Sequence, residues 1–352
     1  MANATKDRMT ALRKLEPGHG VKLVDVAVPD PTEGTALIKV HRAAVCGTDV
    51  HLLHDRFANS PPFTLGHEFS GVVAALGPGT SGVRIGDRVV SENNPRACGT
   101  CRVCRKGFPN LCPHKKAMGI HSDGAFAPYL VLPGDLLHVI PEGISMDAAA
   151  LMEPTAVAAH AVSPPCGIEE GDVVVVLGPG AIGLLCGEIA LALGAARVLI
   201  AGTAQDAELR FPLAKRLGLE PISVETEDLP ARVADVTDGF GADVVVEASG
   251  SPRAVAMLAS LARRAGRVSV VGITGRQSIE VAWDRWIGKG LTCHFSYGSL
   301  RQDWELGLRL LEEGKIDTES LITHRYPLED WPLALAATEK QTSIRSLFEI
   351  GE

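Results

Sequence analysis

Four cysteines in one stretch are the residues with the plainest chemistry. Cys98, Cys101 and Cys104 form two overlapping Cys-x2-Cys pairs, and Cys112 follows after seven intervening residues. Four thiolates at this spacing can close a tetrahedron around Zn(II), which leaves no coordination position for water or substrate. The spacing therefore predicts a structural zinc site, with an iron–sulfur cluster as the less favoured occupant.

A second group of residues has the composition of a catalytic metal site. Cys46 opens the run Cys-Gly-Thr-Asp-Val-His, His67 and Glu68 follow about twenty residues later, and Glu153 lies in a Met-Glu-Pro run. A catalytic zinc takes mixed sulfur, nitrogen and oxygen ligands and keeps one position open. Cys46, His67 and one carboxylate supply that set. Neighbouring residues on a regular strand point to opposite sides, so Glu68 can join His67 only if the chain bends there.

A glycine-rich turn lies between a buried strand and a helix. Residues 178–183 read Gly-Pro-Gly-Ala-Ile-Gly, after the apolar run 172–177 and before the apolar, helix-forming run 184–193. Gly178 permits a tight turn, Gly180 lets the backbone approach a pyrophosphate, and Gly183 lets the helix pack closely on the strand. The phosphates would then bind at the helix N-terminus. The alternative interpretation is a strand–helix turn that binds nothing.

Composition limits the classes of partner. The chain has 352 residues, of which 46% are hydrophobic and 22% are charged, and this suggests a globular protein of two domains. A net charge of −8 and a pI near 5.8 argue against nucleic acid and anionic membranes as partners. The most apolar region, 173–196, is interrupted by Pro179 and Glu188, so no membrane span is expected. We expect a cytoplasmic protein, whose cysteines bind metal and do not form disulfides.

The pattern of predicted elements changes along the chain. Short strands over 22–28, 36–40, 66–76 and 85–90 predict a β-rich, barrel-like domain. An alanine-rich helix is expected over 146–162.

Strands and helices alternate after that helix. Strands are expected at 172–177, 198–201, 242–248 and 267–271, with helices at 184–193, 207–217 and 254–262. This alternation predicts a parallel-sheet domain over 158–295. A helix at 304–313 and a strand at 343–350 would return to the first domain, which then comprises 1–157 and 296–352.

Together these pieces resemble the zinc-dependent medium-chain dehydrogenase/reductase family over nearly the whole chain. The matching motifs are the cysteine loop, the glycine turn and the runs Gly-His-Glu-Phe-Ser-Gly-Val-Val (66–73), Gly-Asp-Arg-Val (86–89) and Asp-Gly-Ala-Phe-Ala (123–127). The Cys-Gly-Thr-Asp-x-His and Met-Glu-Pro runs are similar to the polyol, L-threonine and butanediol dehydrogenase branch. The resemblance implies an α/β protein with a GroES-like catalytic domain and a doubly wound Rossmann cofactor domain.

The resemblance also implies an activity and a set of roles. Zinc held by Cys46, His67 and either Glu68 or Glu153 would serve NAD(P)-linked oxidation of a secondary alcohol of a polyol, and Thr48 with His51 would carry the proton out. The chain would hold two zinc ions, one catalytic and one structural. Within the class, L-threonine 3-dehydrogenase and cyclitol or amino-sugar dehydrogenase are the alternatives. Outside it, the alternative is a non-catalytic sensor that binds zinc and dinucleotide.

Further residues are implied as cofactor contacts. The whole set is Gly178, Gly180, Ile182, Gly183, Gly202, Thr203, Arg210, Val271, Gly272, Ile273, Ser296 and Tyr297.

Cofactor preference is where the chain departs from the family pattern. Gly202 stands where NAD-specific members have an acidic residue, although Asp206 follows four residues later. Room beside Gly202 and Thr203, with Arg210 nearby, would suit the 2′-phosphate of NADP. We expect NAD, with NADP as the alternative. We also expect a small alcohol or ketone substrate and a homotetramer, or else a homodimer.

Overall fold

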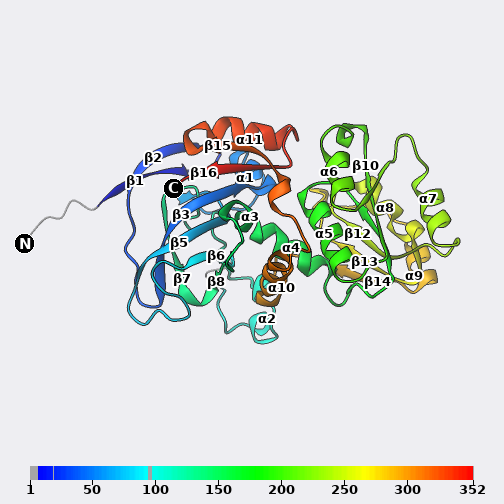
Figure 1. Ribbon diagram of the computed structural model, residues 1–352, viewed down its shortest axis with the longest axis horizontal. Coiled ribbons are helices and arrows are strands. Elements are labelled where there is room, and N and C mark those ends of the chain that lie inside the picture. The colour runs from blue at the N-terminus through cyan, green and yellow to red at the C-terminus, as the bar shows by residue number, and fades with distance from the viewer. Residues whose placement is uncertain (1–6, 19, 94–96, 352) are drawn as a thin grey trace, which may run out of the picture. The chain divides into compact units, whose positions relative to one another are not determined.

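The computed structural model describes residues 7–18, 20–93 and 97–351, and the chain divides into two compact units (Figure 1). The first unit comprises the residues up to Glu153 together with those from Leu321 onward, and the second comprises Pro154–Ser320. Helix α10 (Arg301–Glu312) belongs to the second unit, where Asp303 Oδ2 is 2.8 Å from His160 Nδ1.

The first unit is built from two sheets. Its strands are β1 (Arg8–Lys14), β2 (Val21–Ala27), β3 (Thr35–Val45), β4 (Phe63–Thr64), β5 (Glu68–Leu76), β6 (Arg88–Ser91), β7 (Tyr129–Pro133), β8 (Leu137–Val139), β15 (Ile322–Pro327) and β16 (Arg345–Glu349). A three-stranded sheet has the order β2-β1-β4, and a seven-stranded sheet has the order β15-β16-β3-β5-β6-β8 with β7 paired to β3.

The larger sheet contains strands from both ends of the chain. In Figure 1 the red C-terminal strand β16 lies beside the blue strand β3, and the two pair antiparallel from Ser346 opposite Val45 to Glu349 opposite Arg42. Along β3, Ile38 and Val40 point into the core and alternate with more exposed residues, as the two-residue period of a half-buried strand requires. The aromatic rings of Phe126 and Phe348 pack edge to face inside this core, 4.9 Å apart.

The helices of the first unit are short. They are α1 (Gly47–Leu53), α2 (Arg102–Arg105), α3 (Met146–Ala150) and α11 (Trp331–Glu339), with 3-10 turns at Pro109–Leu111, Gly134–Leu136, Glu319–Leu321 and Leu328–Asp330. The single helix expected over 146–162 is in fact two, because α3 ends at Ala150, its C-cap residue Leu151 has a ψ of 14°, and α4 (Met152–Val162) begins directly after Leu151. Glu153 therefore lies in the first turn of a new helix.

The second unit is a six-stranded sheet. Its strands are β9 (Val173–Leu177), β10 (Arg197–Gly202), β11 (Glu220–Ser223), β12 (Ala242–Glu247), β13 (Ala262–Val270) and β14 (Thr292–Phe295). The order is β11-β10-β9-β12-β13-β14, and every neighbouring pair is parallel. This order confirms the expected doubly wound sheet, in which the strand order reverses beside β9.

Helices connect these parallel strands. They are α4, α5 (Ala181–Ala192), α6 (Arg210–Arg216), α7 (Leu229–Val236), α8 (Pro252–Leu261), α9 (Trp283–Lys289) and α10. The helix expected from Ala207 begins later, at Arg210, because Ala204–Asp206 first form a 3-10 turn capped by Thr203. None of the helices in the described ranges has the length and hydropathy that crossing a bilayer requires.

Candidate metal centres and cofactor site

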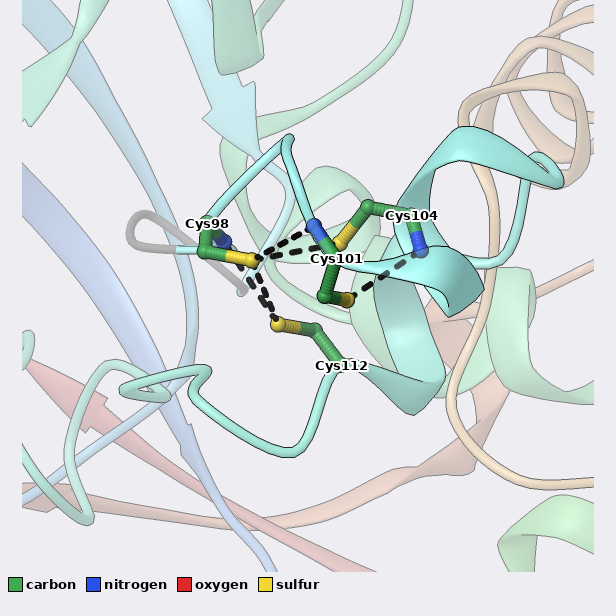
Figure 2. Close-up of side chains that lie close together, drawn as sticks. All are labelled: Cys98, Cys101, Cys104 and Cys112. Atoms are coloured by element: carbon green, nitrogen blue, oxygen red, sulfur yellow. Dashed lines mark hydrogen bonds between the residues drawn. The ribbon is translucent and has the colours of Figure 1, made fainter.

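The four loop cysteines converge on one point, as Figure 2 shows. Cys98 Sγ lies 3.9 Å from Cys104 Sγ and 3.6 Å from Cys112 Sγ. Zinc–sulfur bonds of about 2.3 Å place the sulfurs of a regular tetrahedron about 3.8 Å apart. The sulfur positions therefore fit a tetrahedral zinc site.

Backbone N–H groups also point at these sulfurs. Cys101 N–H donates to Cys98 Sγ and Cys104 N–H to Cys101 Sγ, at 3.3 and 3.4 Å (Figure 2). The N–H groups of Cys101 and Thr100 lower the pKa of Cys98 to about 6, whereas desolvation and the neighbouring thiols raise the pKa of Cys104 to about 12. Four thiolates cannot coexist here without a cation, so the donor chemistry agrees with the geometry.

The second metal group comes from two adjacent elements of the first unit. Cys46 is the N-cap residue of α1, His67 directly precedes β5, and Glu68 is the first residue of β5. One ligand atom from each lies within 4.8 Å of the other two. The required bend is present, because Gly66 has a φ of +93° and a Cβ there would lie 2.4 Å from the ring of Phe126.

Burial and charge make this group a fit for a cation. Glu68 is fully buried and His67 is 4% exposed, and both Glu68 carboxylate oxygens lack a hydrogen-bond partner. Burial alone would lower the pKa of His67, but Asp49 and Cys46 raise it well above its usual range. A half-buried thiol, a buried imidazole and a buried carboxylate are donors that zinc accepts.

Two residues that sequence reasoning missed contact these ligands. Asp49 Oδ1 lies 3.8 Å from His67 Nδ1, and Asp49 Oδ2 accepts a hydrogen bond from Cys46 N–H at 2.9 Å. Arg345 Nη1 lies 3.1 Å from Glu68 Oε1. Asp49 is part of the Cys-Gly-Thr-Asp run and was detectable there, whereas nothing local in the sequence links β16 to β5.

Glu153 lies close to the group but outside it. Its Oε1 accepts a hydrogen bond from Asn93 Nδ2, at 2.5 Å. Burial raises the pKa of Glu153 to about 7, and the nearby Glu68 adds to the shift. The pocket therefore holds an excess of buried carboxyl groups, which a cation would neutralise.

The expected relay residues both lie on α1. Thr48 Oγ1 is 3.7 Å from Cys46 Sγ, and His51 is exposed one turn further along. No hydrogen bond joins Thr48 to His51 in the part of the chain that the structure describes.

The glycine turn has the shape of a phosphate cradle. Gly178 has a φ of +104°, and a Cβ at Gly183 would lie 1.9 Å from Gly178 O, so close packing excludes any side chain at Gly183. At Gly180 a Cβ would meet no atom within 4 Å. The turn is thus tightly packed on one side and open at Gly180, the N-cap of α5, where a pyrophosphate would approach.

The other expected cofactor residues end neighbouring strands of the same sheet. Gly202 is the last residue of β10 and Thr203 follows it, whereas Arg210 opens α6 and is buried. Residues 271–273 follow β13, where the N–H groups of Val271 and Gly272 donate to Glu247 O, and Ile273 is 70% exposed. Ser296 and Tyr297 follow β14. Apart from Arg210, these residues lie at the carboxyl ends of the strands, which is where doubly wound sheets bind ligands.

Comparison with known proteins agrees with both units. Residues 32–142 match the family described as alcohol dehydrogenase GroES-like domain, and residues 181–313 match the zinc-binding dehydrogenase family. The chain is 38% identical to the sorbitol dehydrogenase of Halalkalibacterium halodurans, over 96% of this chain and 98% of that protein. It is 35% identical to the D-arabitol-phosphate dehydrogenase of Enterococcus avium, over 97% of each.

Comparison with a solved structure shows that the similarity extends over both units. An alcohol dehydrogenase of Escherichia coli in complex with NADH superposes with a TM-score of 0.88 at 27% identity, covering 97% of this chain and 99% of that one. The GroES-like and Rossmann architecture that the sequence predicted is confirmed.

Proposed function

Because the chain belongs to the zinc-dependent medium-chain dehydrogenase/reductase family, we propose that this NAD(P)-linked alcohol dehydrogenase oxidises a secondary alcohol of a polyol. The observation that carries the proposal is the group of Cys46, His67 and Glu68, whose ligand atoms lie within 4.8 Å of one another in one unit, together with an open glycine turn in the other. A structural site alone would leave the second donor group without a purpose. Its presence favours an enzyme over a dinucleotide-binding sensor.

The catalytic zinc is assigned to Cys46, His67 and Glu68, and the structural zinc to Cys98, Cys101, Cys104 and Cys112. Glu68 is preferred to Glu153 because one of its oxygens lies within 4.8 Å of the ligand atoms of Cys46 and His67, whereas Glu153 already accepts a hydrogen bond from Asn93. Glu153 is the second carboxylate of the pocket.

The chain's own residues then have distinct tasks. Zinc in this site would act as a Lewis acid that polarises the substrate oxygen. Asp49 fixes the orientation of His67, and Arg345 balances the charge of Glu68. We assign to Thr48 Oγ1, beside Cys46, the uptake of the substrate's hydroxyl proton in concert with release of its own hydroxyl proton, and to His51, exposed on the same helix, the passage of that proton to solvent.

The cofactor would bind across the carboxyl edge of the second unit. The supporting features are the open Gly180 and the strand ends at Gly202, Val271 and Ser296. We assign the substrate and both metals to the first unit and the dinucleotide to the second, with NAD as the cofactor.

The substrate class follows from the relatives. Two of them are named for polyols or polyol phosphates, sorbitol and D-arabitol phosphate. L-Threonine, cyclitols and amino sugars are the alternatives to test. We further propose a cytoplasmic homotetramer, or a homodimer, that binds neither nucleic acid nor membranes, in keeping with the net charge of −8.

The deciding experiment is a screen of NAD- and NADP-linked oxidation over sorbitol, other polyols, diols, cyclitols, D-arabitol phosphate and L-threonine, with zinc counted in the same protein. We expect two zinc ions per chain and the highest kcat/KM with a polyol. Activity with L-threonine alone would overturn the substrate assignment. One zinc ion with no turnover on any alcohol would instead support the sensor.

Matched variants decide between the two carboxylates. Glu68→Gln is expected to lower catalytic zinc occupancy, because it removes a ligand, while Glu153→Gln retains both zinc ions. The reverse result would assign the metal to Glu153.

A further inference from the structure

The end of strand β10 lies directly against the glycine turn. Gly178 N–H donates to Ala201 O at 2.8 Å, and a Cβ at Gly202 would lie 2.7 Å from Pro179 Cγ. In a doubly wound sheet this corner receives the adenosine ribose, so the groups around Gly202 face the 2′ position of the cofactor.

Carboxylates of the chain already occupy the backbone donors at this corner. Thr203 N–H donates to Asp206 Oδ2 at 2.9 Å, and Ala204 N–H donates to Glu225 Oε2 at 3.1 Å. Successive N–H groups at a turn are the donors that typically bind a phosphate. Here both are taken, one by a residue of the same turn and one by a residue that follows β11.

Asp206 stands where the expected acidic residue would be. Its Oδ2 lies 2.7 Å from the position of a Cβ at Gly202, so the carboxylate fills the space into which an acidic side chain at that position would extend. Asp206 Oδ2 also accepts from Thr203 Oγ1, at 3.2 Å. A carboxylate has about four acceptor positions, which leaves capacity for a ribose hydroxyl.

The only nearby cation that sequence reasoning suggested is already paired. Arg210 is 6% exposed, and its Nη1 lies 3.2 Å from Asp206 Oδ1. The guanidinium of Arg210 is thus paired with Asp206, while Glu225 adds a second carboxylate at the same turn through its bond to Ala204 N–H. A 2′-phosphate, with a charge of about −2 near neutral pH, would be repelled and would find the backbone donors occupied.

We propose that Asp206 and Glu225 together select NAD over NADP, by filling the two N–H groups that a 2′-phosphate would need and by presenting negative charge to it. This inference rests on the proposed function, since it requires a dinucleotide at the glycine turn. It assigns Glu225, which lies on a different connection from the glycine turn, as a specificity residue.

The test is equilibrium binding of NADH and NADPH to the purified holoenzyme, followed by the nicotinamide fluorescence. Glu225→Ala frees the Ala204 N–H and removes a charge, whereas Glu225→Gln removes only the charge. Glu208→Gln is the matched control, because Glu208 is exposed next to the same turn and makes no bond to its N–H groups. The double variant Asp206→Asn/Glu225→Ala removes both charges.

We expect the wild type to bind NADH at least about tenfold more tightly than NADPH. Glu225→Ala is expected to reduce that ratio about five- to tenfold, mainly through tighter NADPH binding, and the double variant more. Glu225→Gln should have a smaller effect than Glu225→Ala, and Glu208→Gln should leave the ratio within about twofold.

Four results would contradict the inference. Preference of the wild type for NADPH, or an unchanged ratio in the double variant while both nucleotides still bind, would overturn it and leave the proposed function intact. An equal effect of Glu208→Gln would show general electrostatics in place of the two specific bonds. Binding of neither nucleotide would overturn the proposed function as well.

Discussion

In the proposed catalytic zinc site, different residues are assigned as ligands and as residues that support the ligands. Cys46 and Asp49 are joined by a hydrogen bond within one turn of helix, so the thiol and the group that orients His67 are positioned together. Arg345 is 6% exposed and reaches Glu68 from the last strand of the chain. The charge of the ligand set is therefore balanced by a residue almost 280 positions away in the sequence.

Glu188 predicts a pH-dependent stability. It is 5% exposed, and burial raises its pKa from 4.5 to about 8. Between these values the unfolded carboxyl is ionised while the folded one keeps its proton, so stability falls as the pH rises from about 4.5 to 8 and is constant outside that window. In the Glu188→Gln variant we expect the decrease in the free energy of unfolding over this pH window to be smaller than in the wild type by roughly 2–4 kcal/mol.

Urea unfolding at pH 5.5 and pH 8.5 measures the effect. The variant can still accept the hydrogen bond that Glu188 Oε1 receives from Asp317 N–H. Glu208→Gln, at an exposed position, serves as the control and should keep the wild-type pH dependence. Identical pH dependence in Glu188→Gln and the wild type would show that Glu188 is ionised in the folded protein.

The sequence indicated the candidate metal ligands more readily than the residues that contact them. The four cysteines could be predicted because their spacing in one loop is itself the geometric requirement. Cys46 and His67 could be paired because zinc needs both donor types. Arg345 and Glu225 could not, because each reaches its partner through strand pairing that no local pattern records.

At the scale of elements, two glycines of the turn between β9 and α5 are expected to have different roles, Gly183 in packing and Gly180 in cofactor binding. Gly183→Ala places a Cβ against Gly178 O and is expected to destabilise the fold by about 2–4 kcal/mol. Gly180→Ala, where the Cβ meets open space, should change stability by less than about 0.5 kcal/mol but weaken NADH binding tenfold or more.

Thermal unfolding and NADH titration of the two variants check this pair. If Gly180→Ala bound NADH as the wild type does, the pyrophosphate would not lie at this turn.

The four-cysteine loop is expected to bind its zinc ion independently of the group of Cys46, His67 and Glu68. Cys112→Ser should lower zinc content from two ions to one and lower Tm by about 5–15 °C, because a structural zinc contributes directly to folding. Cys293→Ser is the matched control, since Cys293 lies outside both metal groups, and it should retain two ions. Loss of both ions in Cys112→Ser, or of neither, would contradict separate sites.

Element boundaries were less predictable than element types. The alanine-rich run over 146–162 has high helix propensity, yet the helix is interrupted at Leu151 and a second helix begins at Met152. Helix propensity alone does not mark such a break.

At the scale of the whole molecule, the metal donors and the dinucleotide turn belong to different units. All the assigned zinc ligands lie in the first unit, and the glycine turn with Asp206 and Glu225 lies in the second. We therefore expect zinc removal by a chelator to abolish turnover while the Kd for NADH stays within about threefold of the holoenzyme value.

Fluorescence titration before and after chelation measures this separation, and added zinc should restore turnover. A large loss of NADH affinity in the zinc-free protein would show that the two units do not bind their ligands independently.

The pairing of β16 with β3 has a consequence for biosynthesis. The second unit is one continuous stretch and is complete once Ser320 has left the ribosome, whereas the first still lacks β15, β16 and Arg345. The nascent chain would therefore finish its dinucleotide half first and hold an incomplete catalytic half until its last strand arrives. Truncated polypeptides that end before Arg345 should consequently still bind the dinucleotide but should not form a catalytically active zinc site.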